Sequence, residues 1–194
     1  MGKQKYLNQI SSLFEKSPIV NYSSIEKIIN DKKKVKQYTK QVIRNLIIKR
    51  KIFRLTKGYY TSINDASLFV LCFKETYLGL QDALSFHDIW EQETIPVIIT
   101  SKKIRQGLRK VLGTNVLIRR ISRKYLFGFD HYNQDKFYLP YSDVEKTFID
   151  MIYFNEKLSE EALKNMKKRL NIKKLNFYLK KYPKKFRVKV LNLL

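Results

Sequence analysis

The chain is poor in the residues that build metal and redox sites. Its 194 residues include one cysteine, Cys72, and two histidines, His87 and His131. A single cysteine forms no internal disulfide, and neither histidine has a second ligand at the spacing of a zinc site. Cys72 lies in the apolar run 68–73, which predicts that it packs in a core and favours a cytoplasmic location. We therefore expect no metal and no cofactor, and we expect His87 to be a hydrogen-bonded, partly buried side chain.

Signatures of common enzymes and of membrane proteins are also absent. No Gly-rich loop is followed by Lys and Ser or Thr, which excludes a P-loop. Asp130, Asp135 and Glu145 with Lys146 come nearest to the carboxylates and lysine of a metal-dependent nuclease, but helix capping explains Glu145 and Lys146 better. We predict no catalytic residues and no enzymatic activity. No run of about 18 apolar residues could span a bilayer, and the first residues lead into an amphipathic helix rather than a signal peptide, so no membrane partner is expected.

Acidic residues are scarce relative to basic ones. The chain has 40 Lys and Arg against 17 Asp and Glu, a formal net charge of +23. Residues 1–62 carry 15 basic and 3 acidic side chains, residues 63–156 carry 12 of each, and residues 157–194 carry 13 and 2. Two basic ends thus flank a neutral middle, and we predict three units with these boundaries. Lys and Arg that neutralise phosphates release condensed counterions, so the charge favours a nucleic acid as the partner.

The first unit begins with two predicted helices. Apolar residues follow a helical stripe over residues 3–14, which ends before Pro18. Ser23 followed by Glu26 has the spacing of a capping box, in which each side chain binds a free amide of the other residue. This pair predicts a second, short helix that ends at about Asn30.

A third helix and a hairpin complete the first unit. Residues 35–49 carry a wide apolar stripe at helical spacing, formed by Val35, Tyr38, Val42, Ile43, Leu46 and Ile47. The β-prone runs 52–55 and 59–62 are joined through Gly58, which predicts a hairpin, and residues 19–20 are expected to pair with it. This order is typical of a winged helix-turn-helix, whose second helix of the motif enters the major groove of DNA.

The third helix and the hairpin carry the predicted DNA contacts. Gln37, Gln41 and Arg44 would face base edges, because Gln pairs with adenine and Arg with guanine. The predicted phosphate contacts on and before the helix are Lys33, Lys34, Lys36 and Lys40. Arg54 and Lys57 on the hairpin would reach the adjacent backbone or the minor groove. A basic helix face also occurs as a plain solvated surface, and such helices occur in proteins that bind other proteins, but the net charge favours double-stranded DNA.

The middle unit, residues 63–156, alternates helical and β-prone segments. Short helices are expected at about 64–73 and 78–87, and strands at 95–100, 115–121, 125–129 and 136–139. Ser142 and Glu145 form a second capping-box pattern before an apolar helix. We therefore predict an α+β fold: a winged helix-turn-helix, a mixed α/β domain with a small antiparallel sheet, and a basic helical C-terminal extension packed on that domain.

The last unit, residues 157–194, is helical and basic. Ser159 followed by two glutamates predicts a helix start, whereas the segment after Pro183 fits a helix or a strand. The second basic surface consists of Lys173, Lys174, Lys180, Lys181, Lys184, Lys185 and Arg187. These side chains would hold an RNA or general nucleic-acid backbone in an alternative reading of the function, or would only solvate a helical bundle.

Several motifs follow one another in a defined order. The hairpin closes with Gly58-Tyr59-Tyr60, and residues 77–87 read Tyr-Leu-Gly-Leu-Gln-Asp-Ala-Leu-Ser-Phe-His. A strand with paired Arg119-Arg120, the stretch 126–129 and the helix start at 142–150 come next. Across residues 5–155 this order resembles the AbiEi antitoxin family of bacterial and archaeal toxin–antitoxin systems. The chain departs from the family pattern at Asp88-Ile89-Trp90, where Gly-Leu is usual, and at Asp143, where Pro is usual.

The resemblance implies a function. Members of the family carry an N-terminal winged helix-turn-helix and repress their own operon by binding repeats upstream of it. They also counteract a nucleotidyltransferase toxin, commonly without forming a tight complex, and their C-terminal region is associated with antitoxin activity. The expected partners are accordingly double-stranded operator DNA and a functional toxin partner.

Overall fold

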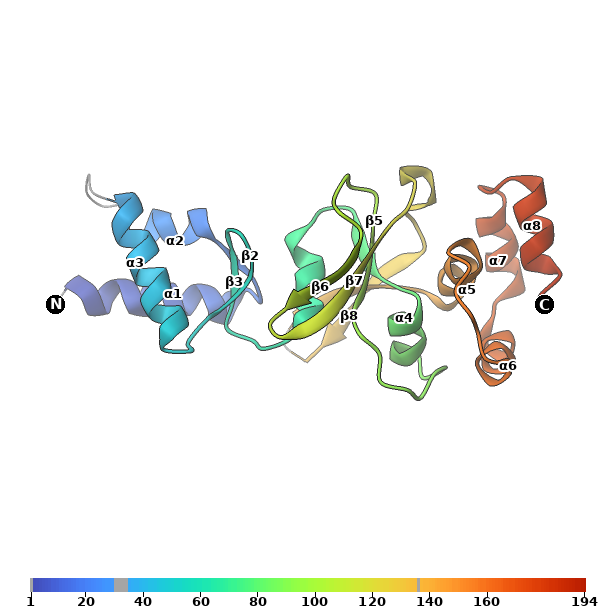
Figure 1. Cartoon of the computed structure of the whole chain (residues 1–194), viewed down its shortest axis with the longest axis horizontal. Helices are drawn as coiled ribbons and strands as arrows, with labels where there is room; N and C mark the ends of the chain where they lie inside the picture. The colour runs from blue at the N-terminus through green and yellow to red at the C-terminus, as the bar shows by residue number, and fades with distance from the viewer. Residues whose placement is uncertain (1, 30–34, 136) are drawn as a thin grey trace.

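The computed structural model describes residues 2–29, 35–135 and 137–194. In this part of the chain the fold is α+β, and the two termini lie at opposite ends of an elongated molecule (Figure 1). A helical N-terminal unit occupies one end, a β-sheet the middle, and helices α5 to α8 the other end (Figure 1).

The N-terminal unit contains three helices and a small sheet. Its elements are α1 (Gly2–Lys16), β1 (Val20–Asn21), α2 (Tyr22–Ile29), α3 (Val35–Ile48), β2 (Phe53–Thr56) and β3 (Tyr59–Thr61). The strands pair antiparallel in the order β1-β3-β2. The predicted hairpin and the leading strand are therefore confirmed. Apolar side chains from all three helices form one buried cluster, which includes Ile10, Phe14, Ile25, Ile43 and Leu46.

The first predicted capping box is wrong. The amide of Ser24 donates to the Asn21 side-chain oxygen at 2.8 Å, and the Ser23 hydroxyl donates to the same oxygen at 3.1 Å. Asn21 therefore caps α2, because β1 runs directly into the helix and leaves Ser23 already inside its first turn.

The larger sheet is mixed rather than antiparallel, which corrects the predicted topology. Its strands are β4 (Thr76–Leu78), β5 (Val97–Thr100), β6 (Gly107–Val111), β7 (Thr114–Arg120), β8 (Phe129–Gln134) and β9 (Phe137–Ser142), in the order β6-β7-β5-β4-β9-β8. Strands β5 and β7 are parallel because the β6–β7 hairpin places β6 on the outer edge. Strands β4 and β9 are also parallel, although they are distant in sequence.

Three strands of this sheet, β4, β6 and β8, were not expected, and the strand expected at 125–129 is absent. Residues 123–125 form the short 3₁₀ helix η2 (Arg123–Tyr125), and the strand β8 begins only at Phe129. Tyr125, Leu126 and Phe127 point their side chains into a buried cluster instead of pairing along a sheet. Strands β6 and β8 are edge strands whose polar side chains hide the apolar alternation that marks a buried strand.

Helices cover both faces of the sheet. The 3₁₀ helix η1 (Ala66–Cys72) packs on one face, where Leu55 of β2 joins the same apolar cluster and links the N-terminal unit to the sheet. The Cys72 thiol is buried there, and burial raises its pKa to about 12, which confirms the predicted core position. The other face is covered by α4 (Gln81–Phe86) and α5 (Val144–Tyr153).

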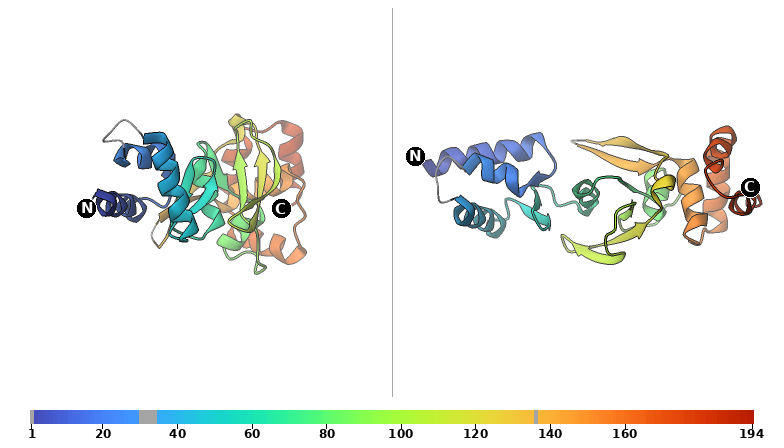
Figure 2. Two further views of the ribbon diagram at one scale, coloured as in Figure 1. Left: turned by 60° about the vertical axis from the view of Figure 1, so that its left-hand side comes forward. Right: turned by 90° about the horizontal axis from the view of Figure 1, so that it is seen from above.

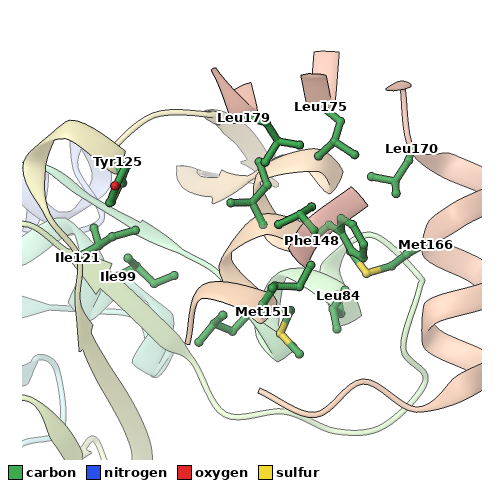
Figure 3. Close-up of a cluster of buried hydrophobic side chains, with 14 of the residues drawn as sticks. Leu84, Ile99, Ile121, Tyr125, Phe148, Met151, Met166, Leu170, Leu175 and Leu179 are labelled. Atoms are coloured by element: carbon green, nitrogen blue, oxygen red, sulfur yellow. The ribbon is translucent and has the colours of Figure 1, made fainter. Parts of the chain in front are cut away.

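The C-terminal helices share the core of the sheet. They are α6 (Glu160–Arg169), α7 (Ile172–Leu179) and α8 (Lys184–Leu191), so the segment after Pro183 is a helix. Ser159 caps α6 as predicted, accepting a hydrogen bond from the Ala162 amide at 3.1 Å. Met166 and Leu170, with Leu175 and Leu179, pack against Phe148 of α5 (Figure 3).

The second predicted capping box is also wrong. Ser142 is the last residue of β9, and the Asp143 carboxylate accepts the amide of Lys146 at 2.7 Å. Glu145 instead accepts the Asn171 amide at 2.8 Å. Lys146 is fully buried and forms an ion pair with Asp150, one helical turn later. Glu145 and Lys146 therefore connect α5 to the C-terminal unit, through Asn171 and Tyr182, rather than capping a helix.

Candidate nucleic-acid interface

The outer face of α3 gathers polar and basic side chains. Gln37, Lys40, Gln41 and Arg44 are all exposed and recur at the three- and four-residue spacing of one helix face. The opposite face, with Thr39, Ile43 and Leu46, is buried against α1 and α2. In Figure 1, α3 lies in front of those two helices.

Three of the predicted phosphate contacts are not placed. Lys33 and Lys34 lie outside the described residues, and so does the side chain of Lys36, although its backbone belongs to α3. Only Lys40 of that set is therefore located on the exposed face. The predicted base-reading set, in contrast, lies within the described part of α3.

Two apolar residues near the end of α3 are exposed: Ile47 was expected to be buried, and Ile48 was assigned to neither face of the helix. Ile47, predicted on the buried stripe, is 36% exposed, and Ile48 is 68% exposed. Ile48 lies one turn after Arg44 and continues the row formed by Gln37, Gln41 and Arg44. An exposed aliphatic side chain in such a row is suited to contact a thymine methyl group. In the sequence, the only signal for this role of Ile48 was its position four residues after Arg44.

The hairpin is held against the start of α2. A two-residue turn, Lys57-Gly58, connects β2 and β3, and Gly58 has a φ of +83°, a conformation that glycine adopts without strain. The Gly58 carbonyl accepts the Tyr22 amide at 2.8 Å. Arg54 and Lys57 are exposed, and the Arg54 Nε atom donates to the Thr56 carbonyl at 3.4 Å.

The basic side chains of this surface are not neutralised by the protein. Within the described residues, no carboxylate lies within 4.0 Å of the charged atoms of Lys40, Arg44, Arg54 or Lys57. Their charges therefore face solvent. The surface can bind a polyanion without first breaking an internal ion pair.

The second basic surface is only partly available. The Lys174 ammonium lies 3.0 Å from the Asp143 carboxylate and 3.1 Å from that of Glu145. Although burial opposes it, hydrogen bonding to these carboxylates raises the pKa of Lys174. The Lys181 ammonium lies 4.0 Å from the centre of the Phe127 ring. Lys174 is therefore already engaged by two carboxylates, and its predicted role in ligand binding stays a prediction.

Two of the remaining cations of the second basic surface flank an exposed aromatic ring on α7. Lys173, Lys180, Lys184 and Lys185 are exposed, whereas Arg187 is half-buried. Phe177 is 61% exposed and lies between Lys173 and Lys180 on the outer row of α7. The sequence pattern did not single out Phe177, and its exposure became visible only in the structure.

The side chains considered for catalysis have other roles. Glu145 is buried and engaged by Lys174 and Asn171, while Asp130 and Asp135 are exposed. In the described ranges, no three His, Cys, Asp or Glu side chains are grouped closely enough to hold a metal ion. His87 is half-buried, and its Nε2 atom lies 2.7 Å from the Ser142 carbonyl oxygen, as predicted for a structural histidine.

Comparison with known proteins adds no assignment. No protein-family model matches the chain, and no curated protein sequence is significantly similar to it. Among the described helices, none combines the length and the apolar character needed to cross a membrane.

Proposed function

We propose that the chain is a DNA-binding antitoxin that represses its own operon through an N-terminal winged helix-turn-helix. The observation that carries the DNA-binding part is the exposed row on α3. It contains two side chains suited to adenine, one suited to guanine and one cation, beside a basic hairpin and without internal ion pairs. The order α1, β1, α2, α3, β2, β3 supports the winged helix-turn-helix part of this proposal.

The antitoxin part of the proposal rests on the resemblance to the AbiEi family. In this proposal, the chain binds repeats upstream of its own gene and counteracts a nucleotidyltransferase toxin without requiring a stable complex with it. Co-expression with the nucleotidyltransferase of the same operon should restore the growth that this toxin arrests. Growth arrest that persists with soluble, folded chain would contradict the antitoxin part alone.

Two single substitutions separate base reading from phosphate binding. Arg44→Ala should weaken binding by about 1–3 kcal/mol on the operator and much less on a scrambled duplex, because a guanine contact carries sequence information. Lys57→Ala should weaken both duplexes alike and reduce the slope of log K against log salt by about one. Fluorescence anisotropy of both duplexes over a salt series measures both effects.

Lys49→Ala is the matched control, because Lys49 is exposed directly after α3 and lies off the predicted base-reading row. It should leave the operator preference unchanged. Equal losses of affinity for operator and scrambled DNA in Arg44→Ala would show that Arg44 does not read a base.

A second candidate function is favoured by Phe177. An exposed aromatic ring flanked by lysines is the arrangement that stacks a base of single-stranded nucleic acid while the cations hold its backbone. In this reading the tail binds RNA. Removing residues 157–194 is not a clean test, because Met166, Leu170, Leu175 and Leu179 belong to the core.

Point substitution tests this candidate without unfolding the tail. Phe177→Ala should weaken binding of a single-stranded oligonucleotide by about 1–3 kcal/mol if a base stacks on the ring. The exposed Ile172→Ala on the same helix is the control. Unchanged RNA affinity in Phe177→Ala would remove the tail from consideration as a base-stacking surface.

A further inference from the structure

The neutral middle unit contains a strongly segregated basic segment. Residues 94–129 include nine Lys and Arg and no Asp or Glu. All 12 acidic side chains of residues 63–156 therefore lie outside this segment. The cations are Lys102, Lys103, Arg105, Arg109, Lys110, Arg119, Arg120, Arg123 and Lys124.

The fold places this segment at one side of the sheet. Strand β6 is the edge strand, and the loop before it, residues 101–106, lies at the same end of the sheet as the end of β7 and η2, because Thr100 pairs with Arg120. Cations of the loop, of the end of β7 and of η2 thus lie at one end of the sheet, and Lys110 lies toward the other end of β6, where it pairs with Asn115. We call Lys103, Arg105, Lys110, Arg120 and Lys124 the β6-edge cluster.

Internal ion pairs remove only part of the charge. Lys102 and Arg123 each lie 3.4 Å from the Glu75 carboxylate, and Arg119 lies 2.6 Å from that of Glu156. The five members of the β6-edge cluster have no carboxylate within 4.0 Å in the described part of the chain, and all five are exposed. Leu108, at 65% exposure, shows that this edge is not covered by another element.

Protection of an open edge does not account for this pattern. Charges on an edge strand prevent pairing with another chain, but four of the five cluster cations lie outside the edge strand β6. A set of one sign, drawn from the loop 101–106, from both strands of the hairpin and from η2, is instead suited to a surface of the opposite sign.

The β6–β7 hairpin lies on the same side of the molecule as α3. In Figure 1 both are drawn toward the viewer. The view from above in Figure 2 places α3, the β2–β3 hairpin and the yellow-green β6–β7 hairpin along the lower side of the molecule, with α1, β8 and β9 along the upper side. The three basic elements therefore follow one long side of the chain.

From this arrangement we infer that the β6-edge cluster binds the phosphate backbone of the same DNA duplex whose major groove α3 enters. A duplex carries one negative charge per about 1.7 Å of its axis, so exposed cations on the sheet, beyond the β2–β3 hairpin, would meet further phosphates along it. This inference rests on the proposed DNA-binding function and extends the contact from the N-terminal unit onto the sheet. The cluster contributes affinity and no sequence preference, because phosphates carry no base identity.

The test is a triple substitution in the full chain. Lys103→Gln, Arg105→Gln and Lys110→Gln remove three exposed charges that make no internal ion pair. The slope of log K against log salt should fall in magnitude by about three, alike for the chain's own upstream duplex and for a scrambled duplex. The matched control is Lys164→Gln, Lys167→Gln and Lys168→Gln, which removes three exposed charges from α6 at the far end of the molecule and should change the slope by less than one.

The outcomes separate this inference from the proposed function. A lower slope in the β6-edge variant with no operator preference in the wild type would support the cluster and contradict the repressor. Operator preference with an unchanged slope in that variant would overturn the cluster and leave the repressor standing. An equal loss in both triple variants would also overturn the cluster, since net charge alone would then explain it.

Discussion

Replacing Lys146 by Met should lower the free energy of unfolding by about 3–5 kcal/mol, because it leaves the buried Asp150 carboxylate without its cation. Both side chains are fully buried, and the Tyr77 hydroxyl donates to the second Asp150 oxygen at 2.6 Å. Burial lowers the pKa of Lys146 and raises that of Asp150, and each charge opposes the effect on the other. The Lys146 ammonium also lies 5.3 Å from the centre of the Phe127 ring.

This ion pair links segments that are far apart in sequence. Tyr77 comes from β4, Lys146 and Asp150 from α5, and the Tyr182 hydroxyl, 3.5 Å from the Lys146 ammonium, follows α7. Gly128 passes so close that a Cβ atom there would lie 2.8 Å from the Cβ atom of Lys146. Loss of the pair should therefore loosen the C-terminal helices together with the sheet.

Urea denaturation followed by circular dichroism measures the effect, and a double variant controls it. Lys146→Met with Asp150→Asn removes both charges and retains an oxygen that accepts the Tyr77 hydroxyl. It should recover most of the lost stability, because replacing a whole buried ion pair by neutral groups costs little. A loss below about 1 kcal/mol in Lys146→Met alone would show that Asp150 is not held as an anion by Lys146.

Asp82→Asn should stabilise the protein more at high pH than at low pH. Burial raises the pKa of Asp82 to about 7, against the hydrogen bond from the Val97 amide, which lowers it, while repulsion from Asp65 adds to the increase. That amide lies 3.2 Å from the carboxylate oxygen. In the unfolded chain an aspartate releases its proton near pH 4.

The folded and unfolded pKa values of Asp82 set the direction in which stability changes with pH. Between about pH 4 and pH 7 the folded chain keeps a proton that the unfolded chain has released, so stability falls as the pH rises through this range and is lost by about pH 7. Asn cannot ionise and still accepts from the Val97 amide. The gain in unfolding free energy over the wild type should be about 2–3 kcal/mol larger at pH 8 than at pH 5.

Urea titrations of the two proteins at both pH values test this prediction. Asp88→Asn is the control, because it removes an exposed carboxylate shortly after α4. A gain in Asp82→Asn that does not change with pH would show that Asp82 is ionised in the folded protein at pH 5.

The local features of the N-terminal unit could be predicted from the sequence. Helical spacing located α3, and the two β-prone runs around Gly58 located the hairpin, because these signals depend on residues within a few positions of one another. The helix starts were wrong wherever a strand ran directly into the helix. Asn21 and Asp143 then cap the helices. The Ser23 hydroxyl instead donates to Asn21, and the Glu145 carboxylate accepts the Asn171 amide.

The sheet and the buried polar groups depend on contacts that the sequence does not display. The parallel pairing of Leu78 with Tyr141 joins strands that are distant in the chain. Lys146 was interpreted as part of a helix cap because its burial is set by β4 and by the C-terminal helices. The one local signal was a Lys and an Asp four residues apart within a largely apolar helix. For the candidate site, the exposed row of α3 could be predicted from helical periodicity. The ion pairs of Lys174 with Asp143 and Glu145, and the placement of the β6-edge cluster on one side of the sheet, became visible only in the fold.

The central claim is that α3 reads a DNA sequence. The most direct measurement is fluorescence anisotropy of the full chain with its own upstream duplex and with a scrambled duplex of equal length, over a salt series. We predict that the upstream duplex binds more tightly and that this preference persists near physiological salt, because base contacts depend on salt less than phosphate contacts do. Equal affinities for the two duplexes, falling together as salt rises, would contradict sequence reading and reduce the basic surface to a general polyanion contact.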